Sequence, residues 1–127
     1  MTQKHDGFIP GSHEIESFGA GGFRFADMSH RGSILVLPTG IRAWDATTPA
    51  EITFDSLKAV LDEPAGSIEL LLIGTGAQLL PIRPDIRARL KEAGIGVDPM
   101  ASAHAVATYN ILLSEKRLVA AAVLAVS

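Results

Sequence analysis

The sequence predicts an α/β protein with three layers, in which helices cover both faces of a central mixed β-sheet. Two apolar runs, residues 68–73 and 118–126, show no polar alternation, which is typical of strands buried on both faces. Segments with helical periodicity alternate with strands along the second half of the chain, and a predicted β-meander precedes them. Alternation of this kind after a meander favours a mixed sheet with helices on its faces.

Length and composition indicate one globular domain. A chain of 127 residues, 47% of them hydrophobic and 20% charged, is long enough to bury a core and excludes a disordered or collagen-like protein. The net charge of −3 argues against a nucleic-acid-binding protein, because phosphate contacts need a concentrated basic surface. The absence of cysteine excludes disulfides, thiolate nucleophiles and cysteine metal sites.

The two ends of the chain bear on its compartment. The first six residues have neither the apolar core of a secretion signal nor the arginine-rich, acid-poor character of a mitochondrial presequence. The run at 118–126 is about half as long as a membrane helix must be. We therefore expect a cytoplasmic protein that is not integral to a membrane.

The amino-terminal third contains short β segments after an arm. Residues 1–14 mix charge, glycine and proline, so we expect a mobile arm followed by a single domain over residues 15–127. The pairs His5-Asp6 and His13-Glu14 have no fixed spacing, and we interpret them as solvated side chains rather than as metal ligands. Short apolar segments separated by glycine and proline turns predict a β-meander up to residue 44.

The first helix is predicted to begin at Thr53, whose hydroxyl can accept a hydrogen bond from an amide of the first turn. Phe54, Leu57, Val60 and Leu61 then share one face, which we expect to pack on the sheet.

Two more helices follow in the second half. Pro84 suits the first turn of one helix and Gly94 suits its carboxyl cap. Asp98-Pro99 is expected to end a short strand before a helix over about residues 102–115. The predicted core face of that last helix consists of Ala105, Val106, Tyr109, Leu112 and Leu113.

A glycine turn follows the first apolar run and provides the main candidate binding site. Gly74-Thr75-Gly76 lies where open α/β sheets usually keep their ligands, with Gln78 close behind. The dinucleotide fingerprint needs a third glycine where this chain has Leu79, and no P-loop motif is present. We favour a turn required by backbone geometry, and a nucleotide or another small ligand remains the alternative.

No catalytic arrangement is evident, and the sequence predicts neither a metal nor a cofactor. The histidines are scattered, and no nucleophile stands in a recognised motif. Tyr109 is expected to be buried, with its hydroxyl bonded to a loop carbonyl. Arg83, Arg87 and Lys91 recur at four-residue spacing and predict a basic stripe on the second helix, which is either a solvated face or a surface for a partner.

Several short motifs occur together in a characteristic order. They are Gly21-Gly22-Phe23-Arg24, Gly32-Ser33, Trp44, Gly74-Thr75-Gly76, Pro81, Gly94-Ile95, Met100, Thr108-Tyr109-Asn110, Glu115 and Arg117. In this order the chain, over about residues 15–126, resembles a small domain-of-unknown-function family that includes assembly factor 3 of mitochondrial complex I and many uncharacterised bacterial and archaeal proteins. Asp98-Pro99 and Ser102 depart from the family's usual pattern.

The resemblance implies a three-layer α/β fold and no established catalytic residue. It also implies a role in assembling membrane or respiratory complexes, so that the partner would be a protein. Two hypotheses remain: a non-enzymatic assembly or interaction module, which the absent nucleophile favours, and a small-molecule enzyme or sensor that uses the glycine turn with Gln78, Arg83 and Tyr109. An exposed patch at the turn would support the first, and a closed polar pocket the second.

Overall fold

The computed structural model describes residues 8–127, which form two β-sheets and three α-helices. The helices are α1 (Lys58–Leu61), α2 (Pro84–Glu92) and α3 (Ser102–Ser114). The strands are β1 (Phe8–Pro10), β2 (Ser17–Gly19), β3 (Gly22–Phe25), β4 (Met28–Arg31), β5 (Ile34–Leu37), β6 (Gly40–Ala43), β7 (Leu70–Gly74), β8 (Gly96–Met100) and β9 (Val119–Val123).

The larger sheet is mixed, as predicted, with the strand order β1-β6-β5-β9-β7-β8. β7 runs parallel to both β8 and β9, whereas β9 and β6 run antiparallel to β5. The two apolar runs correspond to β7 and β9, which pair with each other in the interior of the sheet. Five of five residues are buried in β9 and four of five in β7, which confirms that both faces of the sheet are covered.

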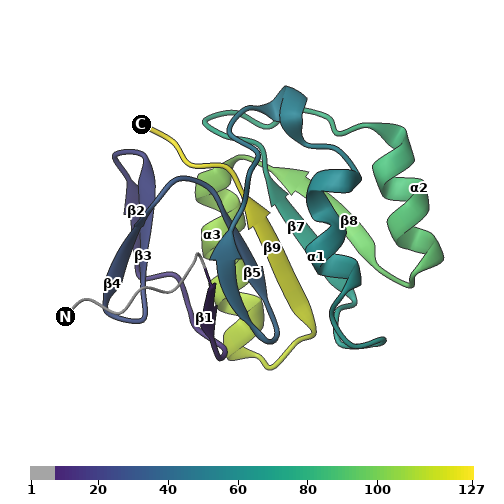
Figure 1. Cartoon of the computed structure of the whole chain (residues 1–127), viewed down its shortest axis with the longest axis horizontal. Helices are drawn as coiled ribbons and strands as arrows, with labels where there is room; N and C mark the ends of the chain where they lie inside the picture. Colours follow the sequence, from purple (N-terminus) through teal and green to yellow (C-terminus); the bar gives the residue numbers. More distant parts are fainter. Residues whose placement is uncertain (1–7) are drawn as a thin grey trace.

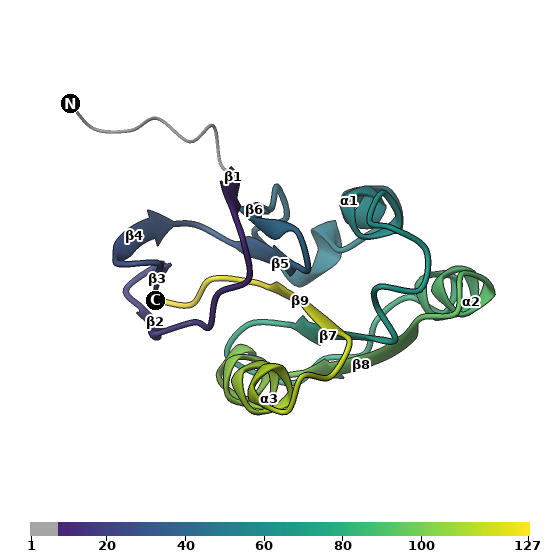
Figure 2. The same ribbon diagram turned by 90° about the horizontal axis from the view of Figure 1, so that it is seen from below.

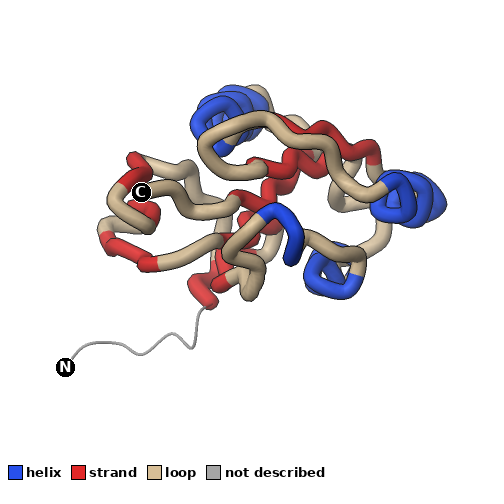
Figure 3. Tube along the Cα trace, turned by 90° about the horizontal axis from the view of Figure 1, so that it is seen from above, coloured by secondary structure: helices blue, strands red, loops and turns tan. Residues whose placement is uncertain are grey.

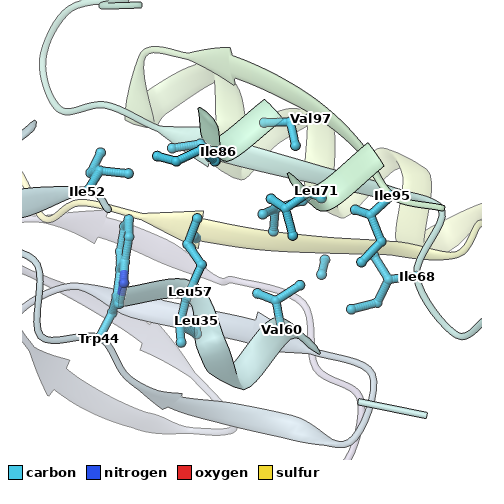
Figure 4. Packing of buried hydrophobic residues seen from close by; sticks show 14 of the residues in the cluster. Leu35, Trp44, Ile52, Leu57, Val60, Ile68, Leu71, Ile86, Ile95 and Val97 are labelled. Carbon is cyan, nitrogen blue, oxygen red and sulfur yellow. The ribbon is translucent and has the colours of Figure 1, made fainter. Parts of the chain in front are cut away.

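Helices cover both faces of this sheet (Figures 1 and 2). One face of the sheet is covered by α1 and α2. The residues that pack there include Leu57, just before α1, Val60 of α1, and Ile86 and Leu90 of α2, in a core that Figure 4 shows at close range. On the other face α3 contributes residues of its predicted core face, of which Ala105, Val106 and Tyr109 are buried and Leu112 and Leu113 are partly buried. The three-layer fold is thereby confirmed, with the helices outside the strands (Figure 3).

The amino-terminal strands do not form one meander. β2, β3 and β4 make a separate three-stranded sheet, whereas β5 and β6 join the larger sheet. Phe23 and Phe25 alternate inward from β3 and pack with Ile34, Val36 and residues of α3. α3 packs mainly against β7 and β9. The small sheet packs beside α3 in the same layer and covers β5 through Phe23 and Phe25.

Part of the segment 1–14, which was expected to be an arm, makes backbone contacts with the domain. Pro10 pairs with Gly40 as part of β1, and the Gly11 amide donates to the Thr39 carbonyl oxygen at 3.0 Å. The buried Ile15 is held by Asn110 of α3, whose amide group accepts from the Ile15 N–H at 2.9 Å and donates to the Ile15 carbonyl at 2.8 Å. Residues 1–7, including the pair His5-Asp6, lie outside the described residues.

The first predicted helix is shorter and less regular than expected. A 3₁₀ turn, Asp55–Leu57, precedes α1, and Thr53 accepts from the Ser56 amide at 3.1 Å as predicted. Leu61, placed on the core face by periodicity, is 36% exposed. The change from a 3₁₀ turn to an α-helix alters the rotation per residue, so the face extrapolated from ideal periodicity does not reach Leu61.

β8 passes through Asp98-Pro99 instead of stopping there. Gly96 donates to the Glu69 carbonyl and Met100 accepts from the Thr75 amide, so alternate residues of β8 bond toward β7 and Pro99 points away from it. Because β8 is an edge strand, the missing N–H of proline leaves no ladder bond unmade.

Candidate functional site

The glycine turn is closed by the hydroxyl of Thr75, which is 2% exposed. Thr75 Oγ1 donates to the Gln78 carbonyl at 2.6 Å and accepts from the Leu80 amide at 3.0 Å. The Thr75 amide donates to the Met100 carbonyl of β8 at 2.8 Å. One buried side chain thus fixes both ends of the loop that leaves β7.

Ser102, the first residue of α3, joins the turn to the last strand. Its buried hydroxyl accepts from the Gly76 amide at 3.0 Å and donates to the Leu124 carbonyl at 2.7 Å, and its own amide donates to the Gly76 carbonyl at 2.8 Å. The amides of both Thr75 and Gly76 are therefore used within the protein. A phosphate site at a glycine turn relies on such amides being available, so this geometry does not favour nucleotide binding.

The two glycines of the turn are required for different reasons. A Cβ on Gly74 would lie 2.8 Å from Val123 Cγ1 and 3.0 Å from both Ser102 Cα and Ser102 Oγ, closer than packed atoms can approach. Gly76 has a φ of +105° and nothing within 4 Å of the corresponding position. Close packing thus selects glycine at residue 74, and backbone conformation selects it at residue 76.

Beyond the turn the loop presents apolar side chains to solvent. Leu79 is 62% exposed and Leu80 is 38% exposed, and Gln78 is exposed beside them. A cleft of about 280 Å³ lies next to this loop, lined by Thr75, Pro81, Ile82, Arg83 and residues 49, 50 and 52. The hydroxyl of Thr75 in the cleft wall already has its partners, so the cleft lacks a free buried polar group of the turn with which to orient a small ligand.

The predicted basic stripe consists of three cations in different situations. Arg83 precedes α2 and pairs through Nε with Asp85 Oδ1 at 3.0 Å, and this hydrogen bond lowers the pKa of Asp85. Arg87 Nη1 donates to the Val97 carbonyl of β8 at 2.7 Å. The Lys91 side chain is exposed and has no hydrogen bond or ion pair with any described residue, whereas the Lys91 carbonyl accepts from the Gly94 amide at 2.9 Å. The stripe is therefore exposed as predicted, but two of its members are engaged locally.

Asp85 and Arg89 are four residues apart on α2, a spacing that favours an ion pair, but the two side chains do not pair. Asp85 bonds to Arg83 instead, and the Arg89 guanidinium stacks 3.7 Å from the centre of the Phe54 ring. A cation over an aromatic face is stabilised both by electrostatic attraction to the ring and by apolar contact with it. An exposed ion pair on a helix surface contributes little to stability.

Tyr109 does not belong to the glycine turn. It stands seven residues after Ser102 on α3, about 10 Å farther along the helix axis. Its ring is buried, and its hydroxyl donates to the His13 carbonyl at 3.4 Å, a loop carbonyl as the sequence predicts. Burial raises the pKa of Tyr109 to about 12, so the phenol stays protonated. Of the predicted site residues, Gly74, Thr75, Gly76 and Gln78 form the turn, and Arg83 lines the cleft beside Thr75. Arg87 and Lys91 lie farther along α2, beside β8, and Tyr109 lies apart on α3.

Two structural residues of this region were not predicted. Ser102 connects three elements through one hydroxyl, and Asn110 fixes both backbone groups of Ile15. A serine at a helix start and a surface-edge asparagine are common in sequences, and their partners are 22 to 95 residues away in the chain. Local pattern carries no signal for contacts at such separation.

Within residues 8–127 no group of three acidic, histidine or cysteine side chains has the arrangement of a metal site. Over the same residues no helix has the length and hydropathy needed to cross a membrane.

Comparison with known proteins places the chain among its relatives. Residues 15–124 match the model of a family described as a protein of unknown function (DUF498/DUF598). The chain belongs to this family. The family resemblance inferred from the motifs is therefore confirmed.

Relatives of this chain include bacterial and mitochondrial proteins. An uncharacterized protein of Rhodobacter capsulatus is 36% identical over 98% of this chain and 93% of its own length. NADH dehydrogenase [ubiquinone] 1 alpha subcomplex assembly factor 3 of Danio rerio is 37% identical over 87% of this chain. The match covers only 63% of that assembly factor's length.

A solved structure has the same fold. The crystal structure of an outer membrane protein from Bartonella henselae superposes with a TM-score of 0.89 and 48% sequence identity. The match covers 94% of this chain and 99% of that chain. Its agreement with the present architecture confirms the α/β fold over almost the whole chain.

Proposed function

We propose that the protein is a non-catalytic binding module that helps to assemble a multisubunit protein complex. The surface that would carry this function is the loop patch, which consists of Leu79, Leu80 and Arg83. The observation that supports it is the contrast within one short segment: the polar groups of the glycine turn are bonded inward, whereas the leucines that follow are held outward.

The loop patch is preorganised for contact with a protein. Thr75 bonds to the residues on both sides of Leu79, so the loop loses little conformational entropy when a partner covers it. Adjacent exposed apolar side chains beside a charged residue are typical of the centre of a small interface. The half-exposed Leu80 and the prolines at 81 and 84 further restrict the segment.

The proposed partners are subunits of respiratory or other membrane complexes. The support is that relatives of this chain include complex I assembly factors. Since this chain corresponds to only part of the length of those proteins, the partner class is carried over as a proposal. The cytoplasm is the compartment we propose for the interaction.

A small-molecule enzyme or sensor is the second candidate, because the cleft of about 280 Å³ adjoins Thr75 and Arg83. The cleft is at the low end of ligand-site volumes, and the turn's polar groups are already bonded. We expect NADH and ATP at modest concentrations to leave the melting temperature unchanged. A rise of several degrees with either nucleotide would promote the enzyme or sensor over the assembly module.

Affinity capture from the native cell tests the proposed function. The wild type and a Leu79→Ser/Leu80→Ser variant would be compared, with Ile111→Ser as a control because Ile111 is 58% exposed on α3. We expect subunits of a membrane complex to co-purify with the wild type and the control, and to fall several-fold with the double variant. Equal recovery of those subunits by the double variant would contradict the proposal.

A further inference from the structure

The small sheet has an outward face whose side chains follow from its strand register. β3 pairs with both β2 and β4, and Arg24 stands opposite Ser17 and Ser29. Two residues along, Gly22 stands opposite Gly19 and Arg31. Side chains two residues apart share a face of a strand, so these two rows lie on one surface. Phe23 and Phe25 point the other way, into the core.

The glycines of the second row leave this surface hollow. A cavity of about 660 Å³ opens over the sheet, lined by residues of all three strands. A Cβ on Gly22 would overlap the carbonyl oxygen of His30, so the floor of the hollow cannot be filled by a side chain there. Phe18 stands at the rim, 37% exposed, and its ring stacks on Phe23 with the centroids 6.4 Å apart. Because Phe18 stands opposite Phe23 in the register, its ring lies on the inner face of the sheet, and the glycines leave the floor of the hollow open on the outer face.

Two arginines share the hollow and are only partly neutralised. Arg24 and Arg31 are diagonal neighbours on adjacent strands, a relation in which the Cα atoms are typically about 7 to 8 Å apart. Arg24 bonds to Ser29 Oγ at 3.2 Å and approaches Glu16 at 3.8 Å. The Arg31 side chain has no ion pair or hydrogen bond with any residue in the part of the chain that the structure describes. Two like charges on neighbouring strands of one face are unfavourable, and a ligand that bears carboxylates would compensate them.

We propose that this arginine hollow, made of Arg24, Arg31, Gly19 and Gly22, binds an acidic, extended segment of a partner protein. Among residues 8–127 no acidic side chain lines the hollow, and Glu16 approaches Arg24 only from outside the lining, so the charge of the hollow is complementary to an acidic segment. The two guanidinium groups arise from different strands and can each engage a separate carboxylate in a bidentate manner.

An extended segment fits the hollow better than a single small anion does. The hollow is open and spans three strands, whereas a small anion is bound tightly only where several donors converge on one point. The surface belongs to a different sheet from the one that positions the loop patch, so the inference does not depend on the proposed function.

Fluorescence anisotropy with a defined peptide tests the inference. The probe is a fluorescein-labelled peptide in which one leucine stands between two short runs of glutamate, and the comparison peptide has lysine in place of glutamate. We expect the full chain to bind the glutamate peptide and not the lysine peptide, with affinity that falls as salt is raised. Absence of binding, or equal binding of both peptides, would overturn the inference.

Variants locate the binding to the hollow. We expect Arg24→Gln/Arg31→Gln to weaken binding by about tenfold or more, and Ser29→Glu to weaken it too because the new carboxylate would neutralise Arg24. Arg117→Gln is the matched control, because Arg117 pairs with Glu115 and does not line the hollow, and this variant should bind as the wild type does. Thermal melts confirm that each variant is folded. A folded double arginine variant with unchanged affinity would overturn the assignment.

Competition separates a docking segment from a small anion. Inorganic phosphate, added at constant ionic strength, should not displace the glutamate peptide at concentrations near that of the peptide. Full displacement under those conditions would mean that the hollow is a site for small anions, which contradicts the proposed occupant.

Discussion

Single residues show how closely the elements around the glycine turn approach each other. Gly74 has no room for a methyl group, because Val123 and Ser102 occupy the space that a Cβ would need. Sequence pattern indicates a glycine turn, but it attributes both glycines to backbone conformation. Only Gly76 has the positive φ angle that such an explanation requires, and the contact at Gly74 involves residues far away in the chain.

Alanine substitutions separate these two causes. We expect Gly74→Ala to lower the free energy of unfolding by about 1 to 3 kcal/mol, as overpacking does. Gly76→Ala should cost about 1 kcal/mol through backbone strain alone. Urea denaturation of both variants measures the difference. A Gly74→Ala protein as stable as the wild type would show that the close approach is relieved without cost.

Tyr109 provides a test at alkaline pH, because it is the single tyrosine of the chain and tyrosinate absorbance reports on it alone. Burial raises its pKa to about 12 in the folded protein, against about 10 when unfolded. The folded state therefore holds the proton more tightly. The stabilisation is fully present below pH about 10 and is lost as the pH rises toward 12.

The expected titration of the folded protein has its midpoint near pH 12, and denaturant should move it to about 10. Tyr109→Phe should remove the corresponding pH dependence of the unfolding free energy. A folded-state midpoint near 10 would mean that the phenol is solvated, and would contradict its placement in the core.

At the scale of elements, sequence predicts best what local pattern determines. Residues 68–73 and 118–126 are apolar without alternation, and both become interior strands of one sheet. Pro84 and Gly94 mark the ends of α2 closely. By contrast, the separation of the small sheet and the pairing of Pro10 with Gly40 depend on long-range contacts, which the periodicity of a segment does not contain.

A charge placed in β7 tests its interior position. Leu71 is fully buried between two strands, so Leu71→Asp would bury an unpaired charge at a cost of several kcal/mol. Against a typical total stability of about 5 to 15 kcal/mol, we expect no cooperatively folded protein. Leu79→Asp is the matched control, since Leu79 is exposed and the variant should fold. Circular dichroism melts compare them, and cooperative unfolding of Leu71→Asp would refute the topology.

For the whole molecule, the candidate site could be located from sequence but not interpreted from it alone. The glycine turn at the carboxyl end of a buried strand is visible in the pattern, as are Gln78 and Arg83. That the turn's polar groups face inward, through Thr75 and Ser102, depends on contacts with Met100 and Leu124, which only the folded chain reveals. The sequence groups Tyr109 with the turn, because helical spacing predicts which face of α3 it occupies but not how far it lies from residue 74.

We propose that the segment after the glycine turn contacts a protein partner. The most direct test of this contact is site-specific photo-crosslinking in the native cell, with a photoreactive amino acid in place of Leu79 or, as a control, in place of Leu118, which is 45% exposed and immediately precedes β9. We expect a discrete crosslinked product that contains a subunit of a membrane complex from residue 79 and not from residue 118. No product at residue 79, or the same products at both residues, would contradict the claim.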